Sequence, residues 1–133
     1  MALYSIPFEV RDYELDFQGI VNNSVYLNYL EHTRHRFLSD RNIDVPALHN
    51  QGVDLVVIRM ELDYKASLRS HDKFRVTVNT CREGNLRIVF NQQIIRMPDE
   101  KLMLAAKAFG VCLRNGRPVR PQDVLDMSRF GAE

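Results

Sequence analysis

One stretch decides how this chain folds: Glu14-Leu-Asp-Phe-Gln-Gly-Ile-Val-Asn-Asn-Ser-Val-Tyr-Leu-Asn-Tyr-Leu-Glu31. It places two acids, a glycine and a pair of asparagines directly ahead of an apolar segment with helical spacing. An ordinary loop needs one helix-capping residue and little more. The additional polar residues therefore indicate a functional loop that leads into a helix N-terminus.

The helix is expected from Ser24 to about Ser39. Tyr26, Leu30 and Phe37 follow one another at spacings of four and seven residues, which places them on one helical face. The residues at 22–24 are all of the types preferred at helix N-caps. The position where the helix begins is therefore strongly signalled.

The rest of the chain alternates between apolar and polar residues, as strands do. The expected strands cover residues 4–13, 53–68, 74–80, 86–94 and 102–113. Pro7 indicates that the first of them lies at a sheet edge. Because one helix cannot cover both faces of such a sheet, we expect an α+β fold in which an antiparallel five-stranded sheet wraps around one long helix. The uncovered face or edge then predicts a dimer.

Composition limits the class of protein. The chain has 133 residues, 45% of them hydrophobic, which suits a single domain over residues 1–133. Eighteen Lys and Arg against 17 Asp and Glu argue against a nucleic-acid binder that works through bulk charge. With no signal peptide or membrane-spanning run in the sequence, a soluble, cytoplasmic protein is expected. Cys81 and Cys112 are expected as buried thiols, and no metal or other cofactor is expected.

A resemblance enters through a spaced motif, which reads Val10-Arg11, then Asp16-x-x-Gly19-x-Val21-Asn22-Asn23-x-x-Tyr26-Leu27-x-Tyr29-x-Glu31. It resembles the signature of hotdog-fold thioesterases of the 4-hydroxybenzoyl-CoA thioesterase type. The runs 11–16 and 19–23 are particularly similar to plant and bacterial acyl-acyl-carrier-protein thioesterases. Residues 62–68, 72–76 and 117–121 also look like family segments, so the resemblance covers nearly the whole chain.

Two departures from the family pattern matter. Glu14 stands where members often have Asp. Phe17 and Ile20 stand where many members have Pro after the second Asp and His or Ile after the glycine. This loop borders the acyl pocket in family members, so the departures concern the substrate. Asp16, which the resemblance makes the catalytic acid, is retained.

The resemblance implies an acyl thioesterase that hydrolyses an acyl-CoA or acyl-carrier-protein thioester. Asp16 would attack as a nucleophile or act as a general base, and the sequence leaves these two roles open. The backbone N–H of Asn23, at the positive end of the helix dipole, would hold the oxyanion. The plainer alternative is that Asp16 only braces the turn. Glu31 is expected as a buried or interface acid paired with an arginine, and it is a minor candidate for catalysis.

Further residues are expected to contact the substrate or to shape the surface. The substrate-contact predictions are Gly19, Val21, Asn22 and Tyr26, with Lys65 and Arg69 as phosphate contacts and Lys73 and Arg114 considered beside them. Glu14 is expected as a surface acid at a strand end. The expectations for histidine are a structural or interfacial role for His32 and His35, and exposure for His49 and His71.

Three alternatives remain at this stage. An aromatic acyl-CoA of the hydroxybenzoyl type is the second choice of substrate. A non-catalytic hotdog module that binds acyl chains is the alternative outside enzymes. A dehydratase is a third, although the residues around His32 and His35 do not match that pattern. The expected assembly is a homodimer joined through sheet edges, paired again into a homotetramer.

Overall fold

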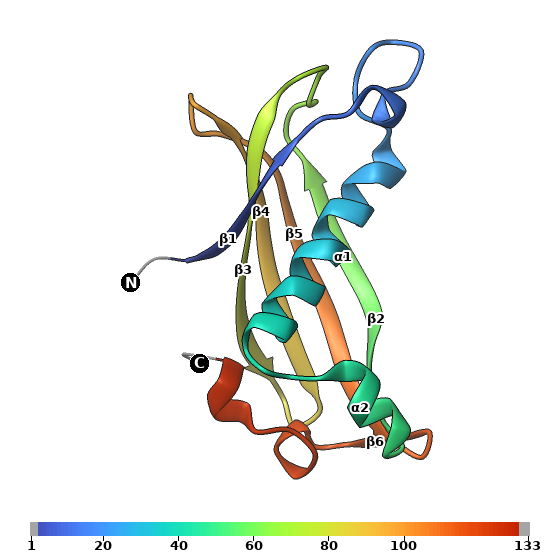
Figure 1. Ribbon diagram of the computed structural model, residues 1–133. Coiled ribbons are helices and arrows are strands. Elements are labelled where there is room, and N and C mark those ends of the chain that lie inside the picture. The colour runs from blue at the N-terminus through green and yellow to red at the C-terminus, as the bar shows by residue number, and fades with distance from the viewer. Residues whose placement is uncertain (1–2, 131–133) are drawn as a thin grey trace.

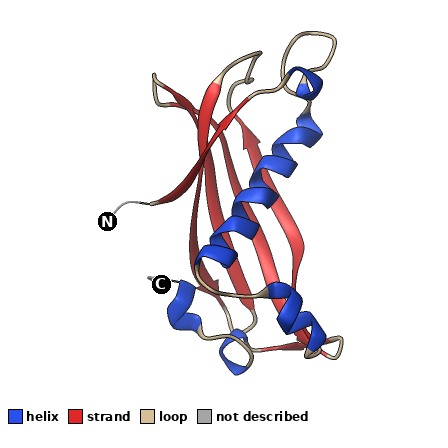
Figure 2. Cartoon of the chain, in the orientation of Figure 1, coloured by secondary structure: helices blue, strands red, loops and turns tan. Residues whose placement is uncertain are grey.

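The computed structural model describes residues 3–130, and its main feature is one long helix lying across a curled antiparallel sheet (Figures 1 and 2). The helix is α1, Asn23–Asp40. The sheet has the order β1-β3-β4-β5-β2, and a short β6 pairs with β5. The strands are β1 (Tyr4–Glu9), β2 (Val53–Tyr64), β3 (Lys73–Glu83), β4 (Arg87–Met97), β5 (Lys101–Arg114) and β6 (Arg117–Val119).

Prediction and structure agree on the helix and on the five long strands. The sixth strand, β6, was not predicted because three residues are too short to show a period. The strand expected to reach residue 68 ends at Tyr64 and has a register shift between Val57 and Arg59. Pro7 does lie in an edge strand, because β1 pairs only with β3. A short helix, α2 (Val45–Asn50), fills the connection after α1.

Short 3₁₀ turns follow the first and the last strand. A 3₁₀ turn at Asp12–Glu14 follows β1, and two more, Pro121–Asp123 and Met127–Phe130, follow β6. Over residues 3–130, no helix is both long and apolar enough to cross a membrane.

The core lies between α1 and the concave face of the sheet, in two clusters. The cluster near the start of α1 contains Tyr26, Tyr29, Leu30 and Phe74, and the cluster near its end contains Phe37 and the residues around it. One buried polar side chain, Gln92 of β4, ties the helix to the sheet. Its amide nitrogen donates to the Leu30 carbonyl at 3.1 Å, and its oxygen accepts from Arg34 at 3.0 Å.

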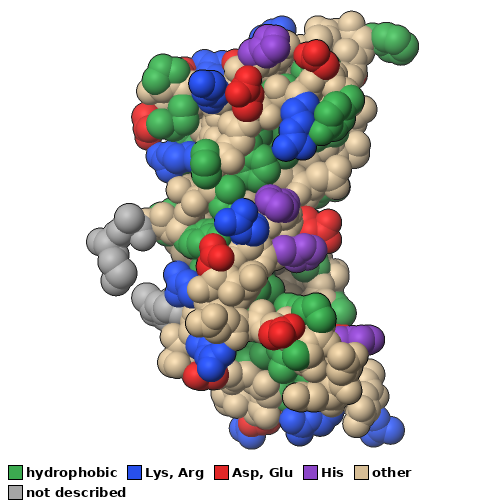
Figure 3. Space-filling model, viewed as in Figure 1, with side chains coloured by type: hydrophobic (Ala, Val, Ile, Leu, Met, Phe, Trp, Pro, Cys, Tyr) green, Lys and Arg blue, Asp and Glu red, His purple; other side chains and the backbone are tan. Residues whose placement is uncertain are grey.

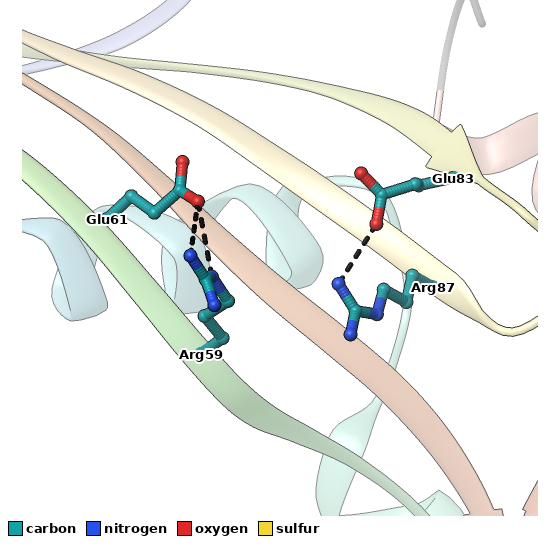
Figure 4. A network of polar contacts seen from close by, with 4 residues as sticks. All are labelled: Arg59, Glu61, Glu83 and Arg87. Carbon is teal, nitrogen blue, oxygen red and sulfur yellow. Dashed lines mark hydrogen bonds and ion pairs between the residues drawn. The ribbon is translucent and has the colours of Figure 1, made fainter.

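The opposite face of the sheet carries two ion pairs (Figure 4). Arg59 pairs with Glu61 at 2.9 Å and Arg87 with Glu83 at 3.0 Å. Both guanidinium groups also lie over the ring of Phe109, at 5.8 Å and 5.5 Å from its centroid. Exposed ion pairs contribute little each, but together with the cation–π contacts they keep this aromatic ring out of water.

The two cysteines differ in their surroundings. Cys112 is buried, as predicted, and burial raises the pKa of its thiol to about 11. Cys81 is exposed, so its predicted burial was wrong. On β3 it alternates with the buried Val76, Val78 and Thr80, so it lies on the outer face of the sheet, away from α1, and membership of a strand alone did not imply burial.

Leu30→Ala tests the dependence of the fold on α1. Leu30 has no exposed surface, so we expect the free energy of unfolding to fall by about 2–5 kcal/mol. Leu27→Ala is a matched control on the same helix, because that side chain is 39% exposed, and its cost should be about 0.5 kcal/mol. Urea denaturation followed by circular dichroism measures both. Equal losses in the two variants would contradict the placement of the core.

Candidate active site

The loop before α1 is a miniature hairpin. Leu15 and Val21 form an antiparallel bridge, and inside it the N–H of Asp16 donates to the Ile20 carbonyl at 2.8 Å. Gly19 takes a φ of +76° at the tip, in the left-handed region that glycine enters without strain. The hairpin therefore returns the chain beside itself just before the helix begins.

Asp16 directs its carboxylate back into this hairpin. Oδ1 accepts the N–H of Gln18 at 2.9 Å and that of Ile20 at 3.4 Å, and the residue is half-buried. Asp16 therefore does brace the turn, as the plainer alternative expected. Because both of these backbone bonds go to Oδ1, they do not use Oδ2, and bracing is compatible with a chemical role.

Helix α1 begins at Asn23, two residues after Val21 of the hairpin bridge. The side chain of Asn22 accepts from the backbone N–H and the hydroxyl of Ser24, both at 3.0 Å, so Asn22 is the N-cap. Asn23 is the first helical residue, and N–H groups at a helix start have no acceptor within the helix. Its N–H is thus placed, at the positive end of the helix dipole, to meet an anionic oxygen.

Glu14 holds the base of the hairpin. One carboxylate oxygen accepts the hydroxyl of Tyr29 at 2.7 Å and the N–H of Arg11 at 2.8 Å. Its carbonyl accepts the N–H of Asn22 at 3.0 Å. Burial, and then the bond to Glu14, raise the pKa of Tyr29. Glu14 is half-buried, so it lies at the surface near the end of β1 as expected, with one carboxylate oxygen bound to the buried Tyr29.

The segment that joins β2 to β3 packs under the hairpin. The N–H of Val21 donates to the Leu68 carbonyl at 2.9 Å, and the N–H of Leu68 donates to the hydroxyl of Tyr26 at 2.9 Å. Val21 and Tyr26, both predicted substrate contacts, are 1% and 2% exposed and belong to the core. Burial raises the pKa of Tyr26. The backbone around the candidate site is therefore held by core residues.

The predicted phosphate contacts separate into two groups. Arg69 bridges to Ile20 of the hairpin, and both Arg69 and Lys65 are exposed at the end of the sheet that carries the site. Arg114 pairs with Val53 and Arg117 at the other end of the sheet, away from the hairpin. Arg114 is therefore not brought to the candidate site, whereas Lys65 and Arg69 are.

Glu31 is exposed in the single chain, so burial within the chain was wrong, whereas a position at an interface stays a prediction. Its nearest charged partner is His35, at 3.8 Å, one turn further along α1 and not an arginine. The helical position was read correctly, but the side chain points away from the sheet. The histidines expected to be exposed, His49 and His71, are exposed.

One neighbour of the site was not identified from the sequence. The hydroxyl of Tyr64, the last residue of β2, lies 3.5 Å from the Asn23 carbonyl, and its ring meets Tyr26 edge to face at 5.6 Å. Tyr64 is 49% exposed, which is unusual for a large aromatic side chain. In the sequence it is one of many strand residues, and only the fold brings it to the helix start.

Comparison with known proteins identifies the family. Residues 10–127 match the family model described as the thioesterase-like superfamily. The chain belongs to this superfamily. Two chloroplast acyl-acyl carrier protein thioesterases of Arabidopsis thaliana, ATL3 and ATL2, are 38% and 37% identical over 88% and 90% of the chain. The aligned part is 62% and 64% of their lengths, so the chain spans a little under two thirds of these superfamily members.

Solved structures of similar shape confirm the hotdog fold. A protein of Aquifex aeolicus has a TM-score of 0.84 at 24% identity, covering 96% of this chain and 98% of its own. A 1,4-dihydroxy-2-naphthoyl-CoA thioesterase from Synechocystis has a TM-score of 0.82 at 16% identity, covering 90% and 89%. The resemblance seen in the motif is thus confirmed at the level of superfamily and fold.

Tyr29→Phe tests whether Glu14 and Tyr29 hold the hairpin. Removing a hydroxyl that binds a half-buried carboxylate should lower the free energy of unfolding by about 1.5 kcal/mol. Above about pH 10 a tyrosine ionises in the unfolded chain, while its raised pKa keeps Tyr29 protonated in the folded one. In the wild type, the stabilisation from Tyr29 is therefore complete below about pH 10 and is lost as the pH rises above this value. Tyr29→Phe lacks the ionisable hydroxyl, so its free energy of unfolding should fall less over the same rise in pH.

The matched control is Tyr13→Phe. The hydroxyl of Tyr13 also takes part in a hydrogen bond, from Arg11 at 2.8 Å, but its side chain is 78% exposed. We expect its removal to change stability by no more than about 0.5 kcal/mol. Denaturation curves at pH 7 and above pH 10 measure both variants. Equal effects of the two substitutions would refute a bracing role for Tyr29.

Proposed function

We propose that the chain hydrolyses acyl thioesters carried by coenzyme A or by an acyl carrier protein. The observation that carries the proposal is the half-buried carboxylate of Asp16 in a hairpin that leads directly to the start of α1. Membership of the thioesterase-like superfamily and the names of the plant relatives support it. No cofactor is part of the proposed reaction.

The proposed reaction uses two groups of this loop. Oδ2 of Asp16 attacks the thioester carbonyl, or takes a proton from a water that attacks it. The carbonyl oxygen becomes an oxyanion, which the N–H of Asn23 binds. Collapse of this intermediate breaks the C–S bond, and the thiolate leaves and takes up a proton. When Asp16 itself has attacked, this step leaves a mixed anhydride on Asp16, which water then hydrolyses to release the acid and regenerate the carboxylate. The products are a carboxylic acid and a thiol, and one water is consumed.

The exposed cations beside the hairpin suit the carrier end of the substrate. Lys65 and Arg69 follow β2, and the bridge between Arg69 and Ile20 fixes their segment next to the loop. Coenzyme A and phosphopantetheine both carry phosphate, which Lys and Arg bind through charge-assisted hydrogen bonds. Gly19 and Asn22, on the same loop, are the proposed backbone neighbours of the thioester.

Asp16→Asn is the decisive variant. We expect it to fold and to lower kcat by about 10²–10⁴-fold, because the amide is neither a nucleophile nor a base. Free-thiol release is measured with short, medium and long aliphatic acyl-CoAs, with aromatic acyl-CoAs, and then with acyl-carrier-protein thioesters. Asp123→Asn, an exposed aspartate in the turn after β6, is the matched control and should keep wild-type rates. A fully active Asp16→Asn protein would overturn the assignment, and Glu31 would be tested next.

We infer that a second copy of the chain covers the open edge of β2. Two apolar residues at the register shift of this edge strand, Val57 and Ile58, are 43% and 52% exposed. An exposed apolar sheet edge promotes association unless it is covered. A two-fold axis beside β2 would join two sheets and place the two candidate sites in one assembly.

Ile58→Lys tests this pairing. A buried lysine at the joined edge should reduce the molar mass from that of the wild-type assembly to that of one chain, as measured by light scattering. A wild-type mass of four chains would support the further pairing into a tetramer. Leu86→Lys, at an exposed apolar position in the turn between β3 and β4, is the control and should keep the wild-type mass. A monomeric wild type would refute the proposal.

A further inference from the structure

A groove runs between β1 and α1, away from the carboxylate of Asp16. Its volume is about 720 Å³. Hydrophobic, basic and histidine side chains lie close together over this part of the molecule in Figure 3. The β1–α1 groove is lined by residues 6–12, His32, Arg36, His71 and Lys73.

Cationic and imidazole side chains form a row along the groove. Strand β1 and α1 run in opposite directions, because Tyr4 packs on Phe37 and Phe8 on His32. Arg36 therefore lies toward the start of β1 and His32 midway. Lys73, opposite Glu9, lies at the far end with His71 and Arg11. The part of the strand from residue 6 to residue 10 is about 13 Å long, which equals between two and three turns of a helix.

The cations of the groove have no carboxylate within ion-pairing distance. Across residues 3–130, none of Arg11, Arg36 and Lys73 has a carboxylate oxygen within 4.0 Å. Two acids also line the groove, and one of them, Glu9, lies 3.9 Å from His71. Three cations against two acids leave an excess of one positive charge before any histidine is protonated. This charge is available to a ligand.

Two other hollows lack this character. The hollow between the end of α1 and α2 is lined by His35, Asp44, two uncharged polar residues and apolar residues, without a lysine or arginine. The hollow on the outer face of the sheet has two acids, Glu61 and Asp63, and one cation, Lys107. An anionic partner is therefore matched by the β1–α1 groove and by neither of these two.

The groove does not suit an added β-strand. Val10 donates its N–H across to Asp72 of the chain leading into β3, so the alternate residues 5, 7, 9 and 11 direct theirs away from β3. Pro7 has no N–H, and that of Arg11 is bound by Glu14. A strand laid along this edge would find too few donors, which leaves side-chain recognition as the means of binding.

We propose that the β1–α1 groove binds an acidic amphipathic helix of the protein that carries the acyl thioester. The proposal rests on the proposed function and commits it to a carrier protein as the natural substrate. Apolar residues of the helix would contact Phe8 and Ile6, and its carboxylates would pair with Arg36, Lys73 and Arg11. The groove lies at the opposite edge of the sheet from β2, so pairing through β2 leaves it open.

The test combines the charge reversals Arg36→Glu and Lys73→Glu. With an acyl-carrier-protein thioester, we expect KM to rise at least tenfold while kcat changes less than twofold. With the N-acetylcysteamine thioester of the same acyl group, which has neither carrier protein nor phosphate, kinetics should stay within twofold of wild type. The difference in KM for the carrier-protein thioester between wild type and the double variant should shrink at high salt, which screens exposed charges. The matched control is Lys107→Glu with Arg117→Glu, two exposed cations outside the groove.

Each other outcome contradicts the proposal in a recognisable way. An equal rise of KM for the acyl-CoA would show a phosphate site. An unchanged KM for the carrier-protein thioester would show that the groove does not bind it. A fall in molar mass of the double variant would show that a second copy of the chain occupies the groove.

Binding can also be measured without catalysis. Fluorescence anisotropy of a labelled holo acyl carrier protein should show association with wild type and with Asp16→Asn, and at least tenfold weaker association with the groove variant. Binding by wild type without thiol release from any thioester would remove the proposed function and keep the groove. Thiol release without binding of the carrier protein would keep the proposed function and remove the proposal for the groove. The two proposals can therefore fail separately.

Discussion

The backbone of Leu68 is the point on which the candidate site depends. Its N–H is bound by the hydroxyl of Tyr26 on α1, and its carbonyl by the N–H of Val21 in the hairpin. Its side chain has no exposed surface. Helix, hairpin and the segment between β2 and β3 therefore meet at one buried peptide, and unpaired polar groups there would be costly. The position of Asp16 follows from this contact because the hairpin cannot shift without breaking it.

Much of the architecture could be predicted because it follows from the hydrophobic periodicity of each segment and from the number of helices and strands. The change from alternation to helical spacing at Ser24 located α1, and one helix beside five strands left little choice but a sheet curled around it. The exceptions are local. β6 is too short to show a period, and Cys81 lies on the outer face of β3, which α1 does not cover. The first limit is one of length. In the second the strand was assigned correctly, but burial depends on which of its two faces a position occupies.

The site was predictable only in part, for a different physical reason. Asp16, Gly19 and the helix start are close in sequence, so the loop could be recognised as a unit. The bond from Tyr29 to Glu14 and the approach of Tyr64 to Asn23 join residues 15 and 41 positions apart. The partial burial of Glu14 depends on such a contact, because its carboxylate binds the hydroxyl of the buried Tyr29. Glu31 is exposed on α1, and its nearest charged partner is His35. Tertiary packing decided the surroundings of both acids.

The two edges of the sheet differ in how readily each can pair with a strand of another chain. A sheet with two competent edges can add copies at both and extend into a filament. Here β2 offers an open edge, while Pro7 removes a donor from the middle of β1 at the other. Strand addition is therefore less favourable at the β1 edge than at the β2 edge, because one of the outward hydrogen bonds of β1 cannot form. A single imino acid thereby disfavours continued growth of the sheet, whatever chemistry the loop performs.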